Sequence, residues 1–185
     1  MRTLYVITLF VISVLIPSNI ISQELNSERR TQEIIASFNK QKNANKEKYG
    51  VSKEKYKRVQ SESVTRPDIR DYAGVYEVPH LGYAINIEVG SDGKVEETGY
   101  EPASGAAQPA RGFRLADTTI VGALLTATKI YEDGTTEKFE GVFINRTEFN
   151  SPTDSGISAF GLGVVGKPVE FAGLTFDKLF YQLKK

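Results

Sequence analysis

The chain has 185 residues with 23 basic and 23 acidic side chains, so its formal net charge is zero. It has no cysteine and one histidine, His80, which excludes disulfide bonds, thiolate zinc sites, cysteine nucleophiles and histidine-rich metal sites. The neutral total disfavours general nucleic-acid binding, and the length fits one domain plus further segments.

Residues 1–22 have the layout of a secretory signal peptide. Arg2 provides a positive start, and residues 4–16 are apolar except for Thr8 and Ser13. This run is shorter than the roughly 20 apolar residues of a membrane-spanning helix, so we expect no transmembrane span in the mature chain. Retention as an uncleaved anchor stays an alternative, because Ser22 is small but Ile20 is not. Export without cysteine predicts a periplasmic or extracellular protein of a bacterial envelope.

Composition divides the remaining chain near residue 66. Residues 23–66 carry a net charge of about plus five, whereas residues 67–185 carry minus six and 15 of the 16 glycines. We predict that 23–66 is a basic segment, helical and partly disordered, with a helix starting near Ser27 and interrupted at Gly50. A second short helix would place Tyr56 and Val59 on one face.

The sequence of residues 67–185 predicts a succession of short β-strands. Apolar residues alternate with other residues over 83–89, and glycines at 90 and 93 favour a hairpin turn before residues 94–100. A second hairpin joins 123–131 to 138–145 through a turn at 132–135. Further strands are expected at 72–78, 113–115, 119–121, 157–165, 169–172 and 177–183, with long loops at 101–112 and 150–156. The pattern predicts a mainly β domain, an antiparallel barrel or sandwich of about eight short strands.

The opening Tyr72-Ala73-Gly74-Val75-Tyr76-Glu77, followed by an alternating strand and Asp92-Gly93-Lys94, resembles small lipocalin-like β domains of bacterial envelope proteins. Some of these domains are attached to β-lactamase-family serine hydrolases. The resemblance implies a β-barrel module and assigns no catalytic residue. The single Ser-x-x-Lys, residues 52–55, lies in a charged segment without a hydrolase domain around it.

No set of residues predicts catalysis, a metal site or a cofactor site. His80 follows a proline at a strand end, and no nucleophile elbow accompanies it. Adjacent Glu96 and Glu97 would point to opposite faces of a strand. Four other glutamates alternate with apolar residues and are expected to face solvent: Glu88, Glu137, Glu140 and Glu170. The glycine-rich run 155–166 lacks the lysine of a phosphate-binding loop.

Aromatic residues from many strands are the most informative feature. They either fill the barrel or line a pocket for an apolar ligand. The wider set includes Phe171, Phe176, Phe180 and Tyr181. The candidate ligand-binding residues of the barrel interior are Tyr76, Tyr83, Ile85, Ile87, Phe113, Tyr131, Phe139 and Phe143.

Three functions follow from these features. The first is an exported, non-enzymatic β-barrel module that binds a small apolar ligand or an envelope protein. The second is a small hydrolase or isomerase that uses carboxylates or tyrosine inside the barrel. The third is a structural adaptor whose basic segment contacts anionic envelope polymer.

Overall fold

The computed structural model describes residues 18–49, 58–77, 86–95, 98–101, 111–149, 151, 153–171 and 174–184. It contains one α-helix, one short 3-10 helix and nine strands in these residues. In chain order they are α1 (Ser18–Tyr49), β1 (Arg58–Ser63), η1 (Ile69–Tyr72), β2 (Gly74–Glu77), β3 (Asn86–Val89), β4 (Thr98–Glu101), β5 (Arg111–Val121), β6 (Leu124–Tyr131), β7 (Thr136–Phe149), β8 (Ile157–Phe171) and β9 (Leu174–Leu183).

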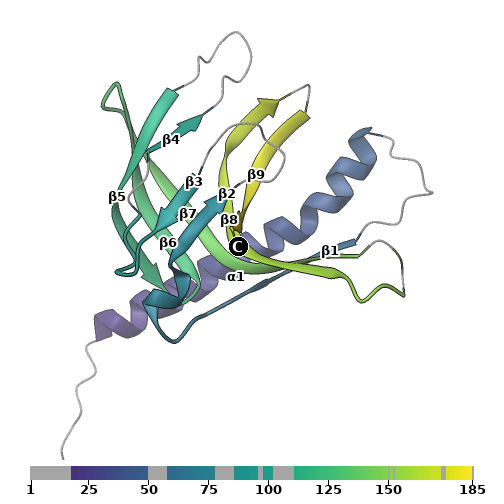
Figure 1. The fold of residues 1–185 in the computed structure, drawn as a ribbon, viewed down its shortest axis with the longest axis horizontal. Helices are drawn as coiled ribbons and strands as arrows, with labels where there is room; N and C mark the ends of the chain where they lie inside the picture. Colours follow the sequence, from purple (N-terminus) through teal and green to yellow (C-terminus); the bar gives the residue numbers. More distant parts are fainter. Residues whose placement is uncertain are drawn as a thin grey trace, which may run out of the picture.

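The strands form one antiparallel sheet that curls into a barrel-like shell rather than a sandwich of two sheets (Figure 1). The strand order is β3-β2-β9-β8-β7-β6-β5-β4, so neighbours in the chain are neighbours in the sheet and β9 returns to pair with β2. An isolated bridge joins Val89 at the end of β3 to Val95, which precedes the other end strand, β4. The predicted mainly β, antiparallel fold is confirmed.

The predicted hairpin around the turn 132–135 is present, with β6 paired to β7. Of the other, the turn 90–94 is present, but its flanking strands are joined in the described residues by a single bridge, Val89 to Val95. The segments expected at 113–115 and 119–121 are one strand, β5, with a bulge where Asp117 has a φ of 53°. Likewise, 157–165 and 169–172 form the single strand β8, whose pairing with β9 is irregular between Val165 and Val169.

The concave face of the sheet holds the larger hydrophobic cluster, which we call the inner core. Alternation along each strand directs every second side chain to this face. Its buried members are Tyr72, Tyr76, Ile87, Val89, Val95, Phe113, Leu115, Leu125, Ala127, Tyr131, Phe139, Phe143, Leu162, Val164 and Tyr181.

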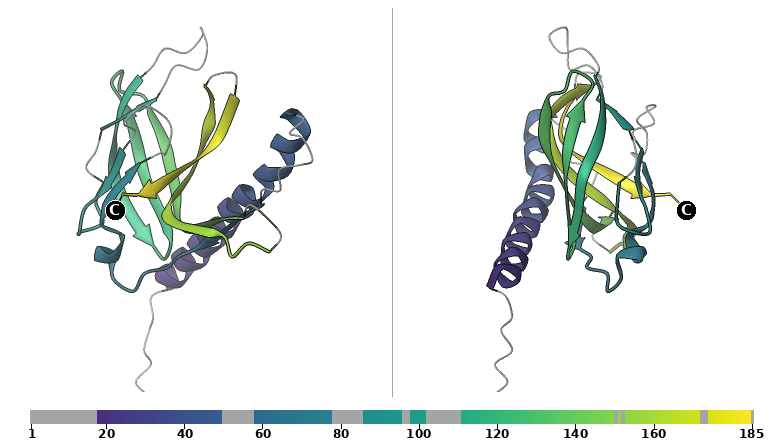
Figure 2. Two further views of the ribbon diagram at one scale, coloured as in Figure 1. Left: turned by 45° about the vertical axis from the view of Figure 1, so that its right-hand side comes forward. Right: turned by 90° about the vertical axis from the view of Figure 1, so that its left-hand side faces the viewer.

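Helix α1 covers the convex face of the sheet (Figure 2). The helix buries Thr31, Ile34, Ile35 and Phe38, a spacing of three to four residues that forms one helical face. This face contacts a second hydrophobic cluster, the outer core, whose sheet members are Ala123, Leu124, Val142, Ile144 and Phe180. Phe180, expected among the barrel-filling aromatics, therefore lies outside the barrel, whereas its neighbour Tyr181 lies inside.

The basic segment 23–66 contains a strand as well as a helix. Strand β1 pairs with β7 over Ile144–Phe149, beyond the part of β7 that pairs with β6. Val59, expected on a second short helix, lies in this strand, while Tyr56 is outside the described residues. The helix also differs from the expectation at its start, since it begins at Ser18 rather than near Ser27, but it ends at Tyr49, before the predicted interruption at Gly50.

Candidate ligand-binding site

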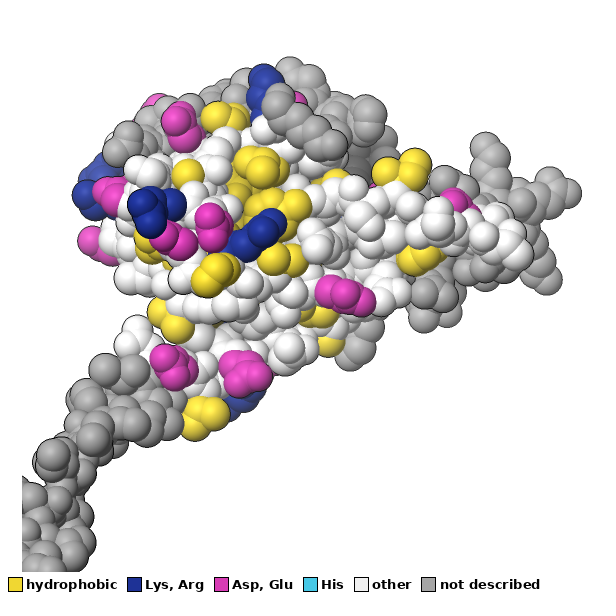
Figure 3. Space-filling view, turned by 60° about the horizontal axis from the view of Figure 1, so that its bottom comes forward, with side chains coloured by type: hydrophobic (Ala, Val, Ile, Leu, Met, Phe, Trp, Pro, Cys, Tyr) yellow, Lys and Arg dark blue, Asp and Glu magenta, His cyan; other side chains and the backbone are white. Residues whose placement is uncertain are grey.

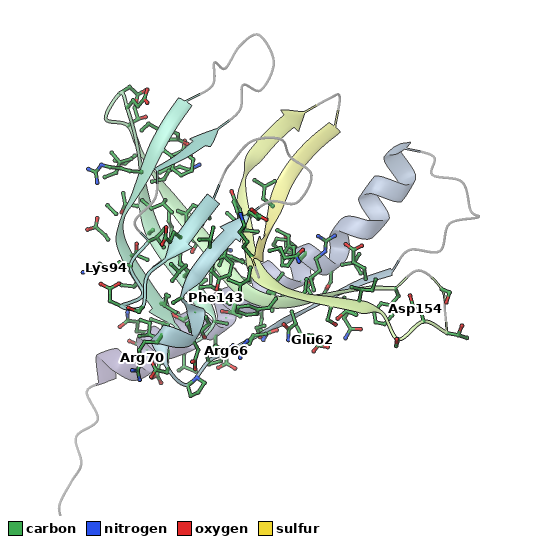
Figure 4. All side chains as sticks on the ribbon, viewed as in Figure 1. Glu62, Arg66, Arg70, Lys94, Phe143 and Asp154 are labelled. Carbon is green, nitrogen blue, oxygen red and sulfur yellow. The ribbon has the colours of Figure 1, made fainter. Side chains whose placement is uncertain are left out.

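One end of the barrel is filled by packed aromatic rings. We call it the η1 end, because η1 and the turns 90–94 and 122–123 lie there. The rings of Tyr72 and Phe143 stack with their centroids 4.2 Å apart, and Tyr76 packs against Phe143 at 5.7 Å. Figure 4 shows Phe143 among the side chains that fill this part of the barrel.

Hydrogen bonds fix the tyrosines at the η1 end. The Tyr76 hydroxyl donates to the backbone oxygen of Tyr72 at 2.6 Å, and the Tyr72 hydroxyl donates to the backbone oxygen of Gly122 at 2.7 Å. Viewed from below, this end is covered by apolar and charged side chains (Figure 3). Desolvation by burial raises the pKa of both hydroxyls, so they stay protonated at neutral pH and serve as structural donors.

The opposite end of the barrel, which we call the far end, has a different inner face. There the turn 132–135 joins β6 to β7. Alternate residues of β6 face inward, and after Leu125 and Ala127 the next inward position is Lys129, followed by Tyr131. Lys129 is thus an inward-facing lysine in a row of buried apolar residues.

The register of the sheet surrounds Lys129 with inward-facing neighbours. It lies opposite Leu115 of β5 on one side and Glu137 of β7 on the other. Its ammonium group lies 4.2 Å from the ring centroid of Phe113 and 5.4 Å from that of Tyr131. In such cation–π contacts the ring faces attract the ammonium charge.

A hydrogen bond links the remaining polar groups of the far end. The Tyr131 hydroxyl donates to a carboxylate oxygen of Glu137 at 3.0 Å. Phe113 and Tyr131 meet edge to face at 6.2 Å and are buried, whereas Lys129 and Glu137 are half-buried. The far end therefore combines buried aromatic rings with two half-buried charges of opposite sign, which lie opposite each other in β6 and β7.

The structure places the predicted site residues in two groups within the inner core. Tyr76, Phe143 and Ile87, which pairs with Tyr76, belong to the filled η1 end. Phe113, Tyr131 and Phe139 lie toward the far end. Tyr83 and Ile85 lie outside the described residues, as does most of the predicted loop 101–112.

Sequence reasoning missed the charged pair of the far end. The sequence does indicate that Lys129 faces inward, because it alternates in phase with Leu125, Ala127 and Tyr131. Glu137 was expected to face solvent, but it shares the inward face with Phe139 and is half-buried.

Glu140, also expected to face solvent, is a buried residue of the convex face. Its carboxylate accepts hydrogen bonds from the Arg30 guanidinium at 2.7 and 3.0 Å and lies 2.6 Å from the Lys138 ammonium. The expectation failed because α1 covers this part of the sheet. Glu88 is exposed as expected, and the side chain of Glu170 is outside the described set.

Other site classes find no support in the described part of the chain. His80 lies outside it. Within it, no group of three or more histidine, cysteine or acidic side chains is placed to hold a metal ion. The helices described there include none with the length and apolarity needed to cross a membrane.

Comparison with known proteins adds no relative. No family model matches the chain, and neither a curated protein nor a solved structure matches it. The functional argument therefore rests on the geometry of the chain itself.

Proposed function

We propose that this protein is an exported, non-enzymatic binding module of a bacterial envelope, and that its barrel binds a small molecule with a large apolar part. The observation that carries the proposal is the contrast between the two ends of the inner core. The η1 end is closed by stacked rings, whereas the far end presents buried rings beside half-buried Lys129 and Glu137.

Lys129 and Glu137 form a cross-strand pair of opposite charges, which can stabilise the sheet, but a core that only fills the barrel has no need of charges on its inward face. Burying the apolar stem of Lys129 leaves a charge that has to reach water or a partner. Two inward charges next to Phe113 and Tyr131 instead suit a ligand with an apolar body and a polar end.

We further propose kinship with small lipocalin-like β domains, which rests on the residues of 72–77 and 92–94. The observed strand order is compatible with this kinship, because β2 to β9 follow one another around the sheet. Export rests on the signal-like residues 1–22.

A protein partner is the second candidate, favoured by one surface feature. Ile157 at the start of β8 is 70% exposed, on the part of the β7–β8 pair that extends past β6 and is joined by β1. A single exposed apolar side chain is common on protein surfaces, so this feature supports a protein partner only through its place on the projecting β7–β8 hairpin.

The test is a native mass spectrum of the full-length gene product, expressed in a bacterium and purified gently from its periplasm. We expect a bound mass of lipid size that is lost on denaturation, and a polypeptide mass shortened by residues 1–22. A bare polypeptide with no adduct would argue against the ligand and for a protein partner. Recovery only from the cytoplasm, with residues 1–22 intact, would overturn export.

Catalysis is tested on the same preparation. We expect no turnover of ester, glycan or peptide substrates above the level of a preparation from cells that lack the gene. Turnover that copurifies with the protein would overturn the non-enzymatic assignment.

A further inference from the structure

We propose that the inward face of the sheet, where it projects beyond the barrel, binds an acidic polysaccharide, and that the Arg66 guanidinium binds a carboxylate of this polymer. This site goes beyond the proposed function, because it lies outside the barrel and does not need a ligand inside it. Three observations carry it: the contact of Arg66 with the ring of Phe160, the lack of an ion pair at Arg66, and the polar side chains beside that ring.

The β7–β8 pair extends past β6 and, together with β1, projects from the barrel (Figure 1). Residues of β7 that alternate with the inner-core Phe143 continue its inward face along this projection. Helix α1 packs on the opposite, convex face. The register places two rows of side chains on the inward face, which we call the open face: Glu62, Asn145 and Phe160 next to the barrel, then Gln60, Thr147 and Ser158.

Arg66 lies where the open face meets the barrel. Its guanidinium carbon is 4.8 Å from the ring centroid of Phe160, and the Phe160 ring lies 6.2 Å from that of Phe143, at an interplanar angle of 13°. The backbone N–H of Arg66 donates to the Tyr72 hydroxyl at 2.6 Å. The backbone and the side chain of Arg66 are thus both ordered before a ligand arrives, which lowers the entropy cost of binding.

The charge of Arg66 is exposed and is not neutralised by a carboxylate of the described residues. By contrast, Arg70 pairs with Asp68, and Arg146 on the convex face of β7 pairs with Glu148. The N–H donors of the Arg66 guanidinium therefore have no oxygen acceptor in this part of the chain. Their fork matches the two oxygens of a carboxylate.

The side chains next to this guanidinium suit the hydroxyl groups of a sugar. Asn145 lies directly opposite Phe160, and its exposed amide makes no hydrogen bond within the described residues. Thr147 and Ser158 add two hydroxyls, which hydrogen-bond to each other at 2.8 Å. Because neighbouring strands lie about 4.8 Å apart, the row from Phe160 across β7 to Glu62 is about 10 Å long. An extended polymer can occupy this row, whereas a single small ion cannot.

Glu62 does not cancel the charge of Arg66. Its carboxylate accepts a hydrogen bond from the Gln60 amide at 2.5 Å, and it belongs to β1, two strands away from Phe160. Salt screens exposed charges over about this distance. A polymer with one carboxylate per sugar unit can place an uncharged stretch beside Glu62, whereas the closely spaced charges of a polyphosphate would be repelled.

Three probes distinguish a carboxylated saccharide from other ligands: tetragalacturonate, its methyl ester and tripolyphosphate. Each is titrated at about 0.15 M salt into the isotope-labelled full-length gene product, purified from the periplasm, and binding is followed by NMR. We expect tetragalacturonate to shift the amide signals of Asn145 and Phe160 and the side-chain N–H signal of Arg66. It should bind at least about fivefold more tightly than either other probe, which corresponds to one exposed ion pair.

Substitutions on and off the open face separate the site from general attraction to positive charge. Arg66→Gln should weaken tetragalacturonate binding at least about fivefold, and Arg66→Lys should restore part of the loss, because lysine keeps the charge without the fork. Asn145→Ala should weaken binding a few-fold. Arg114→Gln is the matched control, because Arg114 is also exposed and unpaired in the described residues but alternates with inward-facing Phe113 and so lies on the convex face. It should leave the affinity unchanged.

Several outcomes would overturn this site. They are an absence of tetragalacturonate binding, equal binding of its methyl ester, or a loss on Arg114→Gln as large as that on Arg66→Gln. Tighter binding of tripolyphosphate at the same signals would assign phosphate in place of the saccharide. None of these results depends on a ligand inside the barrel, so they leave the proposed function standing. Thermal unfolding verifies that each variant is folded, and if Arg66→Gln is not, the probe series and Asn145→Ala decide.

Discussion

The Arg30–Glu140 pair is the most specific polar contact between α1 and the sheet. Burial alone would raise the pKa of the Glu140 carboxyl, but hydrogen bonds from Arg30 and Lys138 outweigh that effect and lower it below its ordinary 4.5. A lowered pKa in the folded state means that the ionised carboxylate stabilises the fold. This contribution is complete above the unfolded pKa and declines as the pH falls through the folded one.

We predict that Glu140→Gln lowers the free energy of unfolding at pH 7 by about 1–2 kcal/mol, a value reduced for the partial exposure of Arg30. The deficit should shrink as the pH falls below about 4.5, because the carboxyl of the unmodified protein then becomes neutral too. Urea unfolding of both proteins between pH 3 and pH 8 measures this difference. A deficit that stays constant across the range would contradict the role of the charge.

Asn39 and Ser61 make a second, neutral contact between α1 and the sheet. The Asn39 amide accepts from the Ser61 backbone N–H at 2.9 Å and donates to the Ser61 backbone oxygen at 3.2 Å. It thereby pairs with backbone groups on the edge of β1 that faces away from β7, which a neighbouring strand would otherwise bind. The buried Ser61 hydroxyl has no hydrogen-bond partner among the described residues.

These two residues should respond differently to alanine. Asn39→Ala leaves two backbone groups without their partner and should destabilise the protein by about 1–2 kcal/mol. Ser61→Ala removes an unpaired buried hydroxyl and should be neutral or slightly stabilising. Chemical denaturation of both variants tests the pair, and equal losses would show that the Ser61 hydroxyl has a partner.

At the scale of elements, the glycines of β8 set how closely its neighbours approach. A Cβ at Gly161 would overlap the backbone oxygen of Tyr181 in β9. A Cβ at Gly163 would lie 3.0 Å from side-chain atoms of Phe38 and Ile144, which can shift slightly. The sheet therefore tolerates a side chain less well at Gly161 than at Gly163.

We predict that Gly161→Ala destabilises the fold by about 2–3 kcal/mol and Gly163→Ala by about 1 kcal/mol or less, because overpacking against backbone cannot relax. Melting temperatures of the two variants, measured together, show which substitution destabilises the protein more. The opposite order would mean that α1 is held more rigidly than the β8–β9 pair.

The sequence predicted strands well where one rule applied. The turn 132–135 and its flanking strands follow from period-two alternation and a glycine with positive φ at 134. The central part of β7 breaks this rule, because residues 139–144 are all buried. The convex face of β7 is covered by α1. The local sequence pattern of β7 cannot predict this contact, because the helix precedes it by more than 100 residues in the chain. Glu140 was misplaced for that reason.

The candidate site, like the strands, could be predicted only in part. Strand alternation identifies Phe113, Tyr131 and Phe139 as inward residues and would have identified Lys129. It cannot say which inward rings stack on one another at the η1 end and which lie beside half-buried charges at the far end. That distinction depends on η1, whose Tyr72 stacks on Phe143, and a four-residue 3-10 turn has no sequence signal comparable with that of a strand.

At the scale of the whole molecule, one sheet separates two hydrophobic clusters. The inner core joins residues from around the sheet, whereas the outer core exists only while α1 is docked. The helix depends on the sheet for a surface, because helices in proteins gain most of their stability from packing. The sheet keeps its own inner core without the helix. We therefore expect that α1 requires the folded sheet, whereas the sheet does not require α1.

Native-state hydrogen exchange should reveal this asymmetry. Ile34→Ala removes a side chain that is 1% exposed, and it should speed exchange of the amides of residues 31–38 by more than tenfold. The amides of β5 and β6 should change much less. Phe143→Ala removes the centre of the aromatic stack and should speed exchange throughout, since α1 cannot stay docked on a sheet that has opened. Equal acceleration in α1 and β5 by Ile34→Ala would instead mean that the two clusters unfold as one cooperative unit.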